Sequence, residues 1–316
     1  MKTRAAFLFL TWLSLGASAQ ADSPQSPTST WPQAYTVRRN DGAGTLALSN
    51  PYYTVQHDLK NGGGVSLIQL TYGRASNLLV RPLESRVTDA SGKVFSDLRD
   101  HAPRVTVQQD GLIEIVTVEC QLKDAQGRSS GIDVKTSYSY RWGYIKIHRE
   151  LAFSAPDCRV TDICPLSTVF ASILSSFGYR DGLSEQEGAP AFSFNACRWG
   201  HITDSTKIGI DTPDVPRYLM VADPGVEGVE WFVSSDLAPW ELSLTGKRGQ
   251  GKTLLQACRD PAGIAFSVSP FSNVHSPVVV PARLAFDFYI GLPLLEGHAL
   301  RPWFHQSFNR TAKSVG

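Results

Sequence analysis

Polar and apolar residues alternate along the middle of the chain with the period of two that is typical of β-strands. In segment 132–141 the apolar or aromatic face carries Ile132, Val134, Thr136, Tyr138 and Tyr140, and the polar face carries Asp133, Lys135, Ser137, Ser139 and Arg141. In segment 144–153 the apolar face carries Ile145, Ile147, Leu151 and Phe153, and Arg149 interrupts it. We therefore predict two antiparallel strands joined by a turn at Trp142-Gly143.

Similar runs of β-branched and aromatic residues recur along the rest of the chain. They cover residues 51–57, 65–72, 104–108, 112–121, 218–222, 229–234, 240–244, 264–269 and 278–290, with turn signals at Asn61–Gly64, Ala90–Gly92 and Ala125–Gly127. No amphipathic segment is long enough for a helix of more than about ten residues, which excludes α/β architectures. No fixed-period repeat supports a β-propeller. We expect an all-β fold, an antiparallel β-sandwich.

The N-terminus has the order of a secretory signal. Lys2 and Arg4 precede an apolar run to Leu13, and small residues follow at Ala17–Ala19. We predict cleavage after Ala19, with Ala21 as the alternative, and a product that is secreted or periplasmic. Residues 20–33 are rich in Ser, Pro and Thr and predict a flexible leader, and no later segment is apolar enough for a membrane span.

Charge and cysteine content limit the possible partners. Without Lys2 and Arg4 the chain has 28 basic and 29 acidic residues, a formal charge of −1, which argues against nucleic acid as a partner. Five cysteines in an exported chain make disulfides possible. We expect a bridge between Cys158 and Cys164 first and one between Cys197 and Cys258 second, with Cys120 as a buried thiol.

Two motifs match nucleotide-binding and hydrolase patterns. Gly246–Thr253 fits the phosphate-binding loop, with Asp287 as a possible metal partner, and Gly127–Gly131 fits the nucleophile elbow of hydrolases. Both patterns require a helix directly after the loop, and the surrounding pattern here is antiparallel β. We interpret both segments as hairpin turns and expect no ATP.

Metal-binding patterns are absent from the sequence. There is no His-Glu-x-x-His motif and no Cys-x-x-Cys pair, so we expect no zinc site. Asp97, Asp100 and His101 either contact a calcium ion or simply lie in a loop. The loop is favoured because they lack the spacing of a calcium-binding loop. We expect no metal and no cofactor.

His148 and Glu150 are the first candidate catalytic residues. Two residues apart on one strand, they leave the same face roughly 6.5–7 Å apart. An imidazole and a carboxylate at this spacing can act as base and acid on a sugar ring. The alternative is that they belong, with Lys146, to the solvated face of a half-buried sheet.

A second candidate cluster lies in a predicted loop after the run Phe192–Phe194. It contains Arg198, Trp199, His201 and Asp204. A tryptophan ring stacks on sugar C–H faces while charged groups bind hydroxyls, so this cluster predicts sugar binding, with His201 as a third catalytic candidate. We also predict that Arg141 binds the substrate, together with Arg198, Trp199 and Asp204. The alternative is a tryptophan that caps the core.

Two stretches resemble a known family. Ser49–Gly64 with Val65–Leu70 resembles the opening strands of galactose-mutarotase-like β-supersandwich domains. Arg217–Trp240, with its Gly-Val-Glu-Trp-Phe strand, looks like a stretch of the N-terminal sandwich in some large secreted glycoside hydrolases. The resemblance implies one supersandwich domain over residues 34–300 and a carbohydrate ligand.

The same resemblance also bears on the residues after the sandwich and on the catalytic residues. In those hydrolases a catalytic barrel follows the sandwich, and Leu300–His305 looks like the link into it, which makes residues 301–316 a tail or a truncated linker. The carboxylates of such a barrel therefore match no residue here. The mutarotase catalytic pair comes from separate parts of the sandwich and does not match His148 and Glu150 on one strand.

These observations predict an exported β-sandwich that binds or helps process an oligo- or polysaccharide, as an accessory or N-terminal domain of a glycoside-hydrolase-like protein. The alternative is a stand-alone epimerase of the mutarotase type or a polysaccharide lyase. A third possibility is a non-catalytic structural protein of the cell envelope.

Overall fold

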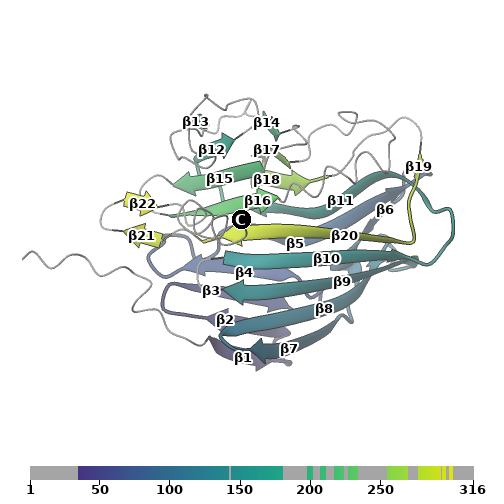
Figure 1. Ribbon diagram of the computed structural model, residues 1–316, viewed down its shortest axis with the longest axis horizontal. Coiled ribbons are helices and arrows are strands. Elements are labelled where there is room, and N and C mark those ends of the chain that lie inside the picture. Colours follow the sequence, from purple (N-terminus) through teal and green to yellow (C-terminus); the bar gives the residue numbers. More distant parts are fainter. Residues whose placement is uncertain are drawn as a thin grey trace, which may run out of the picture. The chain divides into compact units, whose positions relative to one another are not determined.

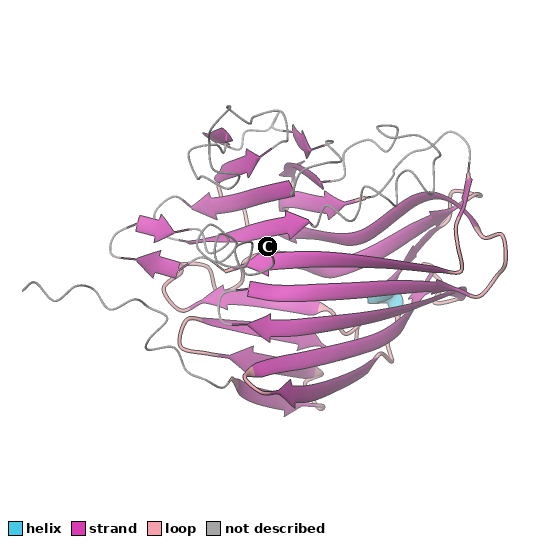
Figure 2. Ribbon diagram, in the orientation of Figure 1, coloured by secondary structure: helices cyan, strands magenta, loops and turns pink. Residues whose placement is uncertain are grey.

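A computed structural model describes residues 35–141 and 144–180, and then 198–201, 207–210, 217–223, 227–233, 255–269, 277–292, 294–296 and 299–301. All of them belong to one unit, residues 32–316. They form antiparallel sheets (Figure 2), and the helical element within these ranges is one 3-10 turn, η2 (Asp97–Arg99). None of the described helices has the length and apolar character needed to cross a bilayer. The predicted all-β antiparallel sandwich is confirmed.

The smaller of the two main sheets has four strands in sequence order. They are β1 (Thr36–Asn40), β2 (Thr45–Ser49), β3 (Tyr53–Asp58) and β4 (Val65–Leu70). The turn between β3 and β4 is tight because Gly62 and Gly63 adopt positive φ angles of 71° and 69°. The carboxylate of Asp58 accepts the backbone N–H groups of Lys60 and Asn61, at 2.8 and 3.1 Å, and fixes this turn.

The larger sheet is built around long central strands (Figure 1). Its path runs through β13 (Arg198–His201), β12 (Ser176–Arg180), β15 (Arg217–Asp223), β16 (Glu227–Val233), β20 (Arg283–Gly291), β10 (Tyr144–Phe153), β9 (Ser129–Arg141), β8 (Ile113–Lys123), β6 (Val94–Ser96), β5 (Leu79–Asp89), β11 (Arg159–Phe170), β18 (Gly263–Val268), β17 (Leu255–Asp260) and β14 (Lys207–Ile210). β7 (Arg104–Asp110) pairs with β8, and β19 (Val278–Val279) pairs with β11. β21 (Leu294–Glu296) and β22 (Ala299–Arg301) form a separate pair.

The core fills the space between the small sheet and the inner face of the large one. Leu46, Leu48 and Val55 of the small sheet are fully buried, as are Ile145 and Ile147 of the large sheet. Removing each such side chain from water contributes about 1.5–3 kcal/mol. A hydrogen bond also links the two sheets: the hydroxyl of Tyr53 on β3 donates to the carbonyl of Arg141 on β9 at 3.2 Å. The apolar face of each central strand therefore points inward and its polar face outward.

Arg149 lies inside this core with only 1% of its surface exposed. Its guanidinium donates to the hydroxyls of Thr136 at 2.9 Å, Ser85 at 2.6 Å and Tyr138 at 3.0 Å, and to the Pro165 carbonyl. The residue that interrupts the apolar pattern of β10 is thus buried and satisfied by hydrogen bonds.

Two further polar side chains, those of His57 and Asp97, are also buried in the core. The His57 Nδ1–H donates to the Gly63 carbonyl at 2.8 Å, and its Nε2 accepts from the Tyr140 hydroxyl at 2.6 Å. The carboxylate of Asp97 accepts the Ser85 backbone N–H at 2.9 Å. Burial lowers the pKa of His57 to about 4 and raises the pKa of Asp97 to about 6, although the nearby Arg149 charge opposes the shift of Asp97.

Most of the predicted strands are confirmed, and several real strands escaped prediction. β10 covers Tyr144–Phe153 as expected, and Gly127–Gly131 spans the turn and the first residues of β9. β1 and β2 were missed because each is only five residues long, and β5 and β11 because a proline interrupts each of them. The predicted Trp142-Gly143 turn, the run 240–244 and the loop Gly246–Thr253 lie outside the described residues.

The predicted disulfide between Cys158 and Cys164 is wrong. Cys158 directly precedes β11 and Cys164 lies within it. Six residues along an extended strand span about 20 Å, whereas a disulfide needs Cα atoms within about 7 Å. Both thiols are free, as is Cys258, and Cys197 lies outside the described residues. Cys120 is a buried thiol, as predicted.

Candidate functional site

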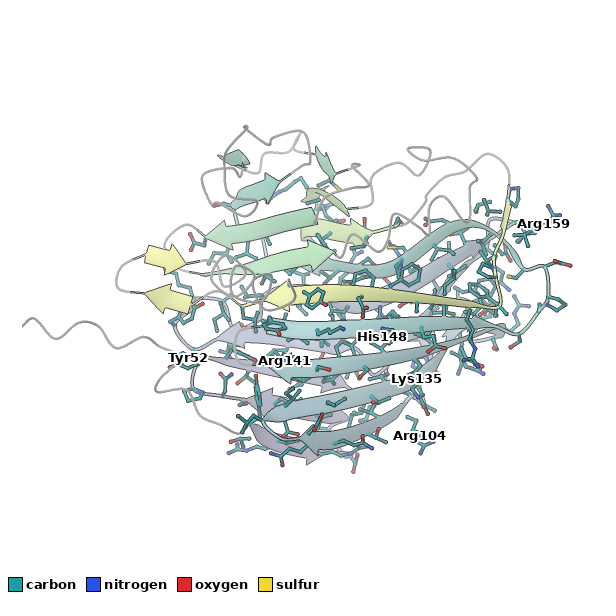
Figure 3. The ribbon with its side chains drawn as sticks, viewed as in Figure 1. Tyr52, Arg104, Lys135, Arg141, His148 and Arg159 are labelled. Atoms are coloured by element: carbon teal, nitrogen blue, oxygen red, sulfur yellow. The ribbon has the colours of Figure 1, made fainter. Side chains whose placement is uncertain are left out.

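The outer face of β8, β9, β10 and β20 gathers the polar residues that alternate with the core. Strand pairing arranges them in rows across the sheet. One row joins Thr117, Ser137, His148 and Asp287, and the next joins Ile115, Ser139, Lys146 and Tyr289. Figure 3 labels Arg141 and Lys135 on β9, His148 on β10, and Arg104 on the adjoining strand β7. On this face, opposite the small sheet, the side chains are half-buried or exposed.

His148 and Asp287 form the central pair of this face. They lie directly opposite each other on β10 and β20, and His148 Nδ1 is 2.9 Å from Asp287 Oδ1. Because a carboxylate only accepts, Nδ1–H donates this hydrogen bond, which leaves Nε2 as the acceptor atom of the neutral imidazole. The imidazole is 47% exposed, so Nε2 can accept a proton from a bound ligand. Sequence reasoning missed Asp287 as the partner of His148, since no local pattern reveals a pair 139 residues apart.

Two tyrosines lie beside this pair. The rings of Tyr144 and Tyr289 have centroids 6.2 Å apart and are tilted by 50°. Lys146 Nζ lies 5.9 Å from the Tyr289 ring centre, and the Arg141 guanidinium lies 6.0 Å from that of Tyr144. Gly291 stands opposite Tyr144 and adds no side chain. The result is an aromatic platform bordered by two cations, which together with His148 and Asp287 we call the His148 site.

Glu150 shares the face with His148, as predicted, but has a different partner. Its carboxylate lies 3.3 Å from Arg283 Nη1 of β20. His148 and Glu150 are thus each paired across to β20 and are not paired with each other. Lys146 Nζ lies closer to the His148 pair, 3.8 Å from Asp287 Oδ1. Whether His148 and Glu150 act as base and acid stays a prediction.

A depression of about 690 Å³ begins at Glu150 and extends over β9, β8 and β7. At its far end Asp100 accepts from Lys123 Nζ at 2.9 Å and from the Gln121 backbone N–H at 2.8 Å. These bonds outweigh partial burial and lower the pKa of Asp100. In its middle Glu119 lies 3.6 Å from Arg104 and 3.5 Å from Lys135. We call this depression the charged groove.

The second predicted cluster is only partly described. Arg198, Trp199 and His201 lie on β13, a strand at one edge of the large sheet and not the predicted loop. Asp204 lies outside the described residues. Arg141 lies at the exposed end of β9 and borders the aromatic platform. The roles of these residues as substrate ligands stay predictions.

Asp97, Asp100 and His101 do not converge on a common point. Asp97 and Asp100 bind the backbone N–H groups of Ser85 and Gln121, and His101 Nδ1 contacts the Asn61 side-chain oxygen at 2.9 Å. Among the residues that the structure describes, no cluster of three His, Cys, Asp or Glu side chains is arranged to hold a metal ion. The three residues serve the turn that contains η2.

The fold is similar to that of carbohydrate-active proteins. The chain superposes on the α-galactosidase AgaB from Geobacillus stearothermophilus with a TM-score of 0.52 and 11% identity, over 81% of this chain and 40% of that one. It superposes on a putative aldose 1-epimerase from Klebsiella pneumoniae with a TM-score of 0.50 and 11% identity, over 89% of this chain and 87% of that one. The fold is therefore a galactose-mutarotase-like β-supersandwich, as the sequence resemblance implied.

The sequence itself gives no closer match. No model of a protein family matches the chain, and no curated protein matches it. The chain spans well under half the length of the α-galactosidase.

Proposed function

We propose that this protein binds an oligo- or polysaccharide at the His148 site. The observation that carries the proposal is the aromatic platform of Tyr144 and Tyr289 directly beside the exposed pair of His148 and Asp287. Tyrosine rings stack on the apolar face of a sugar, and the neighbouring charged groups bind its hydroxyls. The hydroxyls of Ser137 and Ser139 face the same side and add short polar contacts.

The chain acts outside the cytoplasm, as an accessory or N-terminal domain of a glycoside-hydrolase-like protein. The signal-like residues 1–19 support export. The similarity in fold to 40% of an α-galactosidase supports a domain that works beside a separate catalytic part. The predicted boundaries are a leader at 20–33, the sandwich at 34–300 and a tail or linker at 301–316.

Glycan-array binding by the protein starting at residue 20 tests this function. We expect binding to a subset of glycans and a loss of at least about tenfold in affinity for Tyr144→Ala and Tyr289→Ala, because each removes a stacking surface. Leu112→Ala is the control, since Leu112 is 45% exposed in the turn between β7 and β8, away from the platform. Failure of the unaltered protein to bind any glycan would refute the proposal.

The second candidate is a stand-alone epimerase, favoured by the free Nε2 of His148. Anomer interconversion needs a base that takes the proton of the anomeric hydroxyl while the ring oxygen receives one and the ring bond breaks. His148 serves as the base, Asp287 holds its ring, and the ammonium of Lys146, 3.8 Å from Asp287 Oδ1, serves as the proton donor.

Polarimetry of an aldose solution tests the epimerase. His148→Gln is expected to abolish the catalysed rate, and Asp287→Asn to lower it strongly because the ring loses its orientation. Undiminished catalysis in His148→Gln would exclude this residue as the base, and His201→Ala is then the next variant. Double-bond formation in uronic-acid polymers tests the lyase alternative with the same variants.

A further inference from the structure

The charged groove owes its shape to one small residue. Ala152 of β10 lies in a cross-strand row between Asp133 of β9 and Arg283 of β20. The methyl group of Ala152 is shorter than the carboxylate-bearing side chain of Asp133 and the guanidinium-bearing side chain of Arg283 on either side of it, so the row is hollow at this point. Ala152 and both of its neighbours line the depression of about 690 Å³.

The groove carries no net charge. Its four cations are Arg104, Lys123, Lys135 and Arg283. Its four carboxylates are Asp100, Glu119, Asp133 and Glu150. A polyanion gains affinity by meeting an excess of positive charge, and this groove offers none.

Cations and carboxylates also alternate along one row. Arg104, Glu119, Lys135 and Glu150 lie opposite one another on β7, β8, β9 and β10. A ligand that lies across the strands therefore meets hydrogen-bond donors and acceptors in turn.

The middle of this row has unused hydrogen-bonding capacity. Glu119 lies 3.5 Å from Lys135 and 3.6 Å from Arg104, so these ion pairs are longer than good charged hydrogen bonds. Their side chains are 43%, 59% and 76% exposed. Exposed pairs of this kind contribute little to stability, and the groups are available to a ligand.

We infer that the charged groove is a second subsite for a neutral, uncharged glycan whose chain continues from the His148 site. A sugar hydroxyl accepts from a cation and donates to a carboxylate at once, so adjacent hydroxyls match the alternating row. A uronic-acid chain would place its carboxylates against Glu119 and Glu150 as often as against the cations. This inference rests on the proposed function and narrows its ligand class.

The experiment uses Ala152→Phe, which fills the hollow and suits a strand position. Glu119→Gln combined with Lys135→Gln keeps the shape and removes the charges. Gln69→Phe, at an exposed position on β4 of the other sheet, is the matched control. Neutral and uronic-acid-rich glycans are printed on one array, and the best neutral oligosaccharide is titrated calorimetrically at low and high salt.

We expect the unaltered protein to prefer neutral glycans, with a Kd that changes less than about twofold with salt. Ala152→Phe and the double variant should weaken binding by at least about tenfold, and Gln69→Phe should not. Binding that survives in Ala152→Phe, or that is confined to uronic-acid glycans with strong salt dependence, overturns the inference while the His148 site stands. Absence of all glycan binding removes both.

Discussion

Replacing the buried Arg149 by methionine isolates the contribution of the polar network inside the sandwich. Methionine fills much of the same volume without the guanidinium. The hydroxyls of Thr136 and Tyr138 then lose a donor, and the carboxylate of Asp97 loses the nearest positive charge. The Pro165 carbonyl keeps one bond, since the Ser85 hydroxyl lies 3.2 Å from it.

The expected loss in the free energy of unfolding follows from the partners of Arg149 that stay buried after the substitution. Removing one member of a buried charged network typically destabilises a protein by about 3–5 kcal/mol, because its partner is left without compensation. The total stability of a domain is about 5–15 kcal/mol. Arg149→Met should therefore remove a large fraction of the stability. The second substitution Asp97→Asn should recover part of the loss, because asparagine still accepts from the Ser85 N–H but carries no charge.

Urea unfolding followed by tryptophan fluorescence measures these differences as shifts of the midpoint at constant slope. Arg38→Met, on the exposed strand β1, is the control and should change the free energy of unfolding by less than about 0.5 kcal/mol. A loss below about 1 kcal/mol in Arg149→Met, or no recovery in the double variant, would show that the buried network does not depend on the Arg149 charge.

Three further outcomes follow from the same core. Gly63→Ala should lower the free energy of unfolding by about 1–3 kcal/mol, because φ is 69° and the new Cβ would lie 2.6 Å from Val118 Cγ1. Gly127→Ala, whose Cβ would lie in open space, should lower it by only about 1 kcal/mol, and urea unfolding measures both. The pKa of His57 is lowered to about 4 in the folded state, so the unfolded chain takes up a proton at this side chain at higher pH than the folded protein does. The folded state therefore loses about 3 kcal/mol of stability as pH falls from 6.5 to 4. The raised pKa of Asp97, about 6, acts in the opposite sense, so the folded state gains about 3 kcal/mol as pH falls from 6 to 3.8. Unfolding measured against pH should therefore show Asp97→Asn losing stability on acidification more steeply than the unaltered protein, and equal slopes would contradict the raised pKa of Asp97. Thiol titration of the native protein should leave Cys120 and Cys164 unreacted until urea is added, and fast modification of either would contradict their burial.

Sequence patterns predicted the central strands well because each has one face in the core. β9 and β10 follow the alternation expected of them, and the glycines between β3 and β4 mark a real turn. The same patterns failed for β11, where Pro165 and a nearly continuous buried run replace the alternation. They also suggested a disulfide from cysteine spacing, which an extended strand makes impossible.

The candidate site shows where sequence reasoning ends. The position of His148 on an outer face follows from the period of two, and the structure agrees. Its partner Asp287 depends on which distant strands pair and in which register, and no local property of segment 283–291 encodes that choice. The groove likewise depends on Ala152 lying between the larger side chains of Asp133 and Arg283 from two other strands.

The separation of His148 and Asp287 in sequence has a consequence for how the protein matures. Bringing β10 and β20 together closes a loop of more than a hundred residues, and such distant pairings form late in folding. During synthesis the chain must extend past Gly291 before β20 is available. A nascent or proteolytically shortened chain can form the hairpins of β8, β9 and β10 without ever carrying the His148 site. Ligand binding at this site would therefore report on completion of the sandwich.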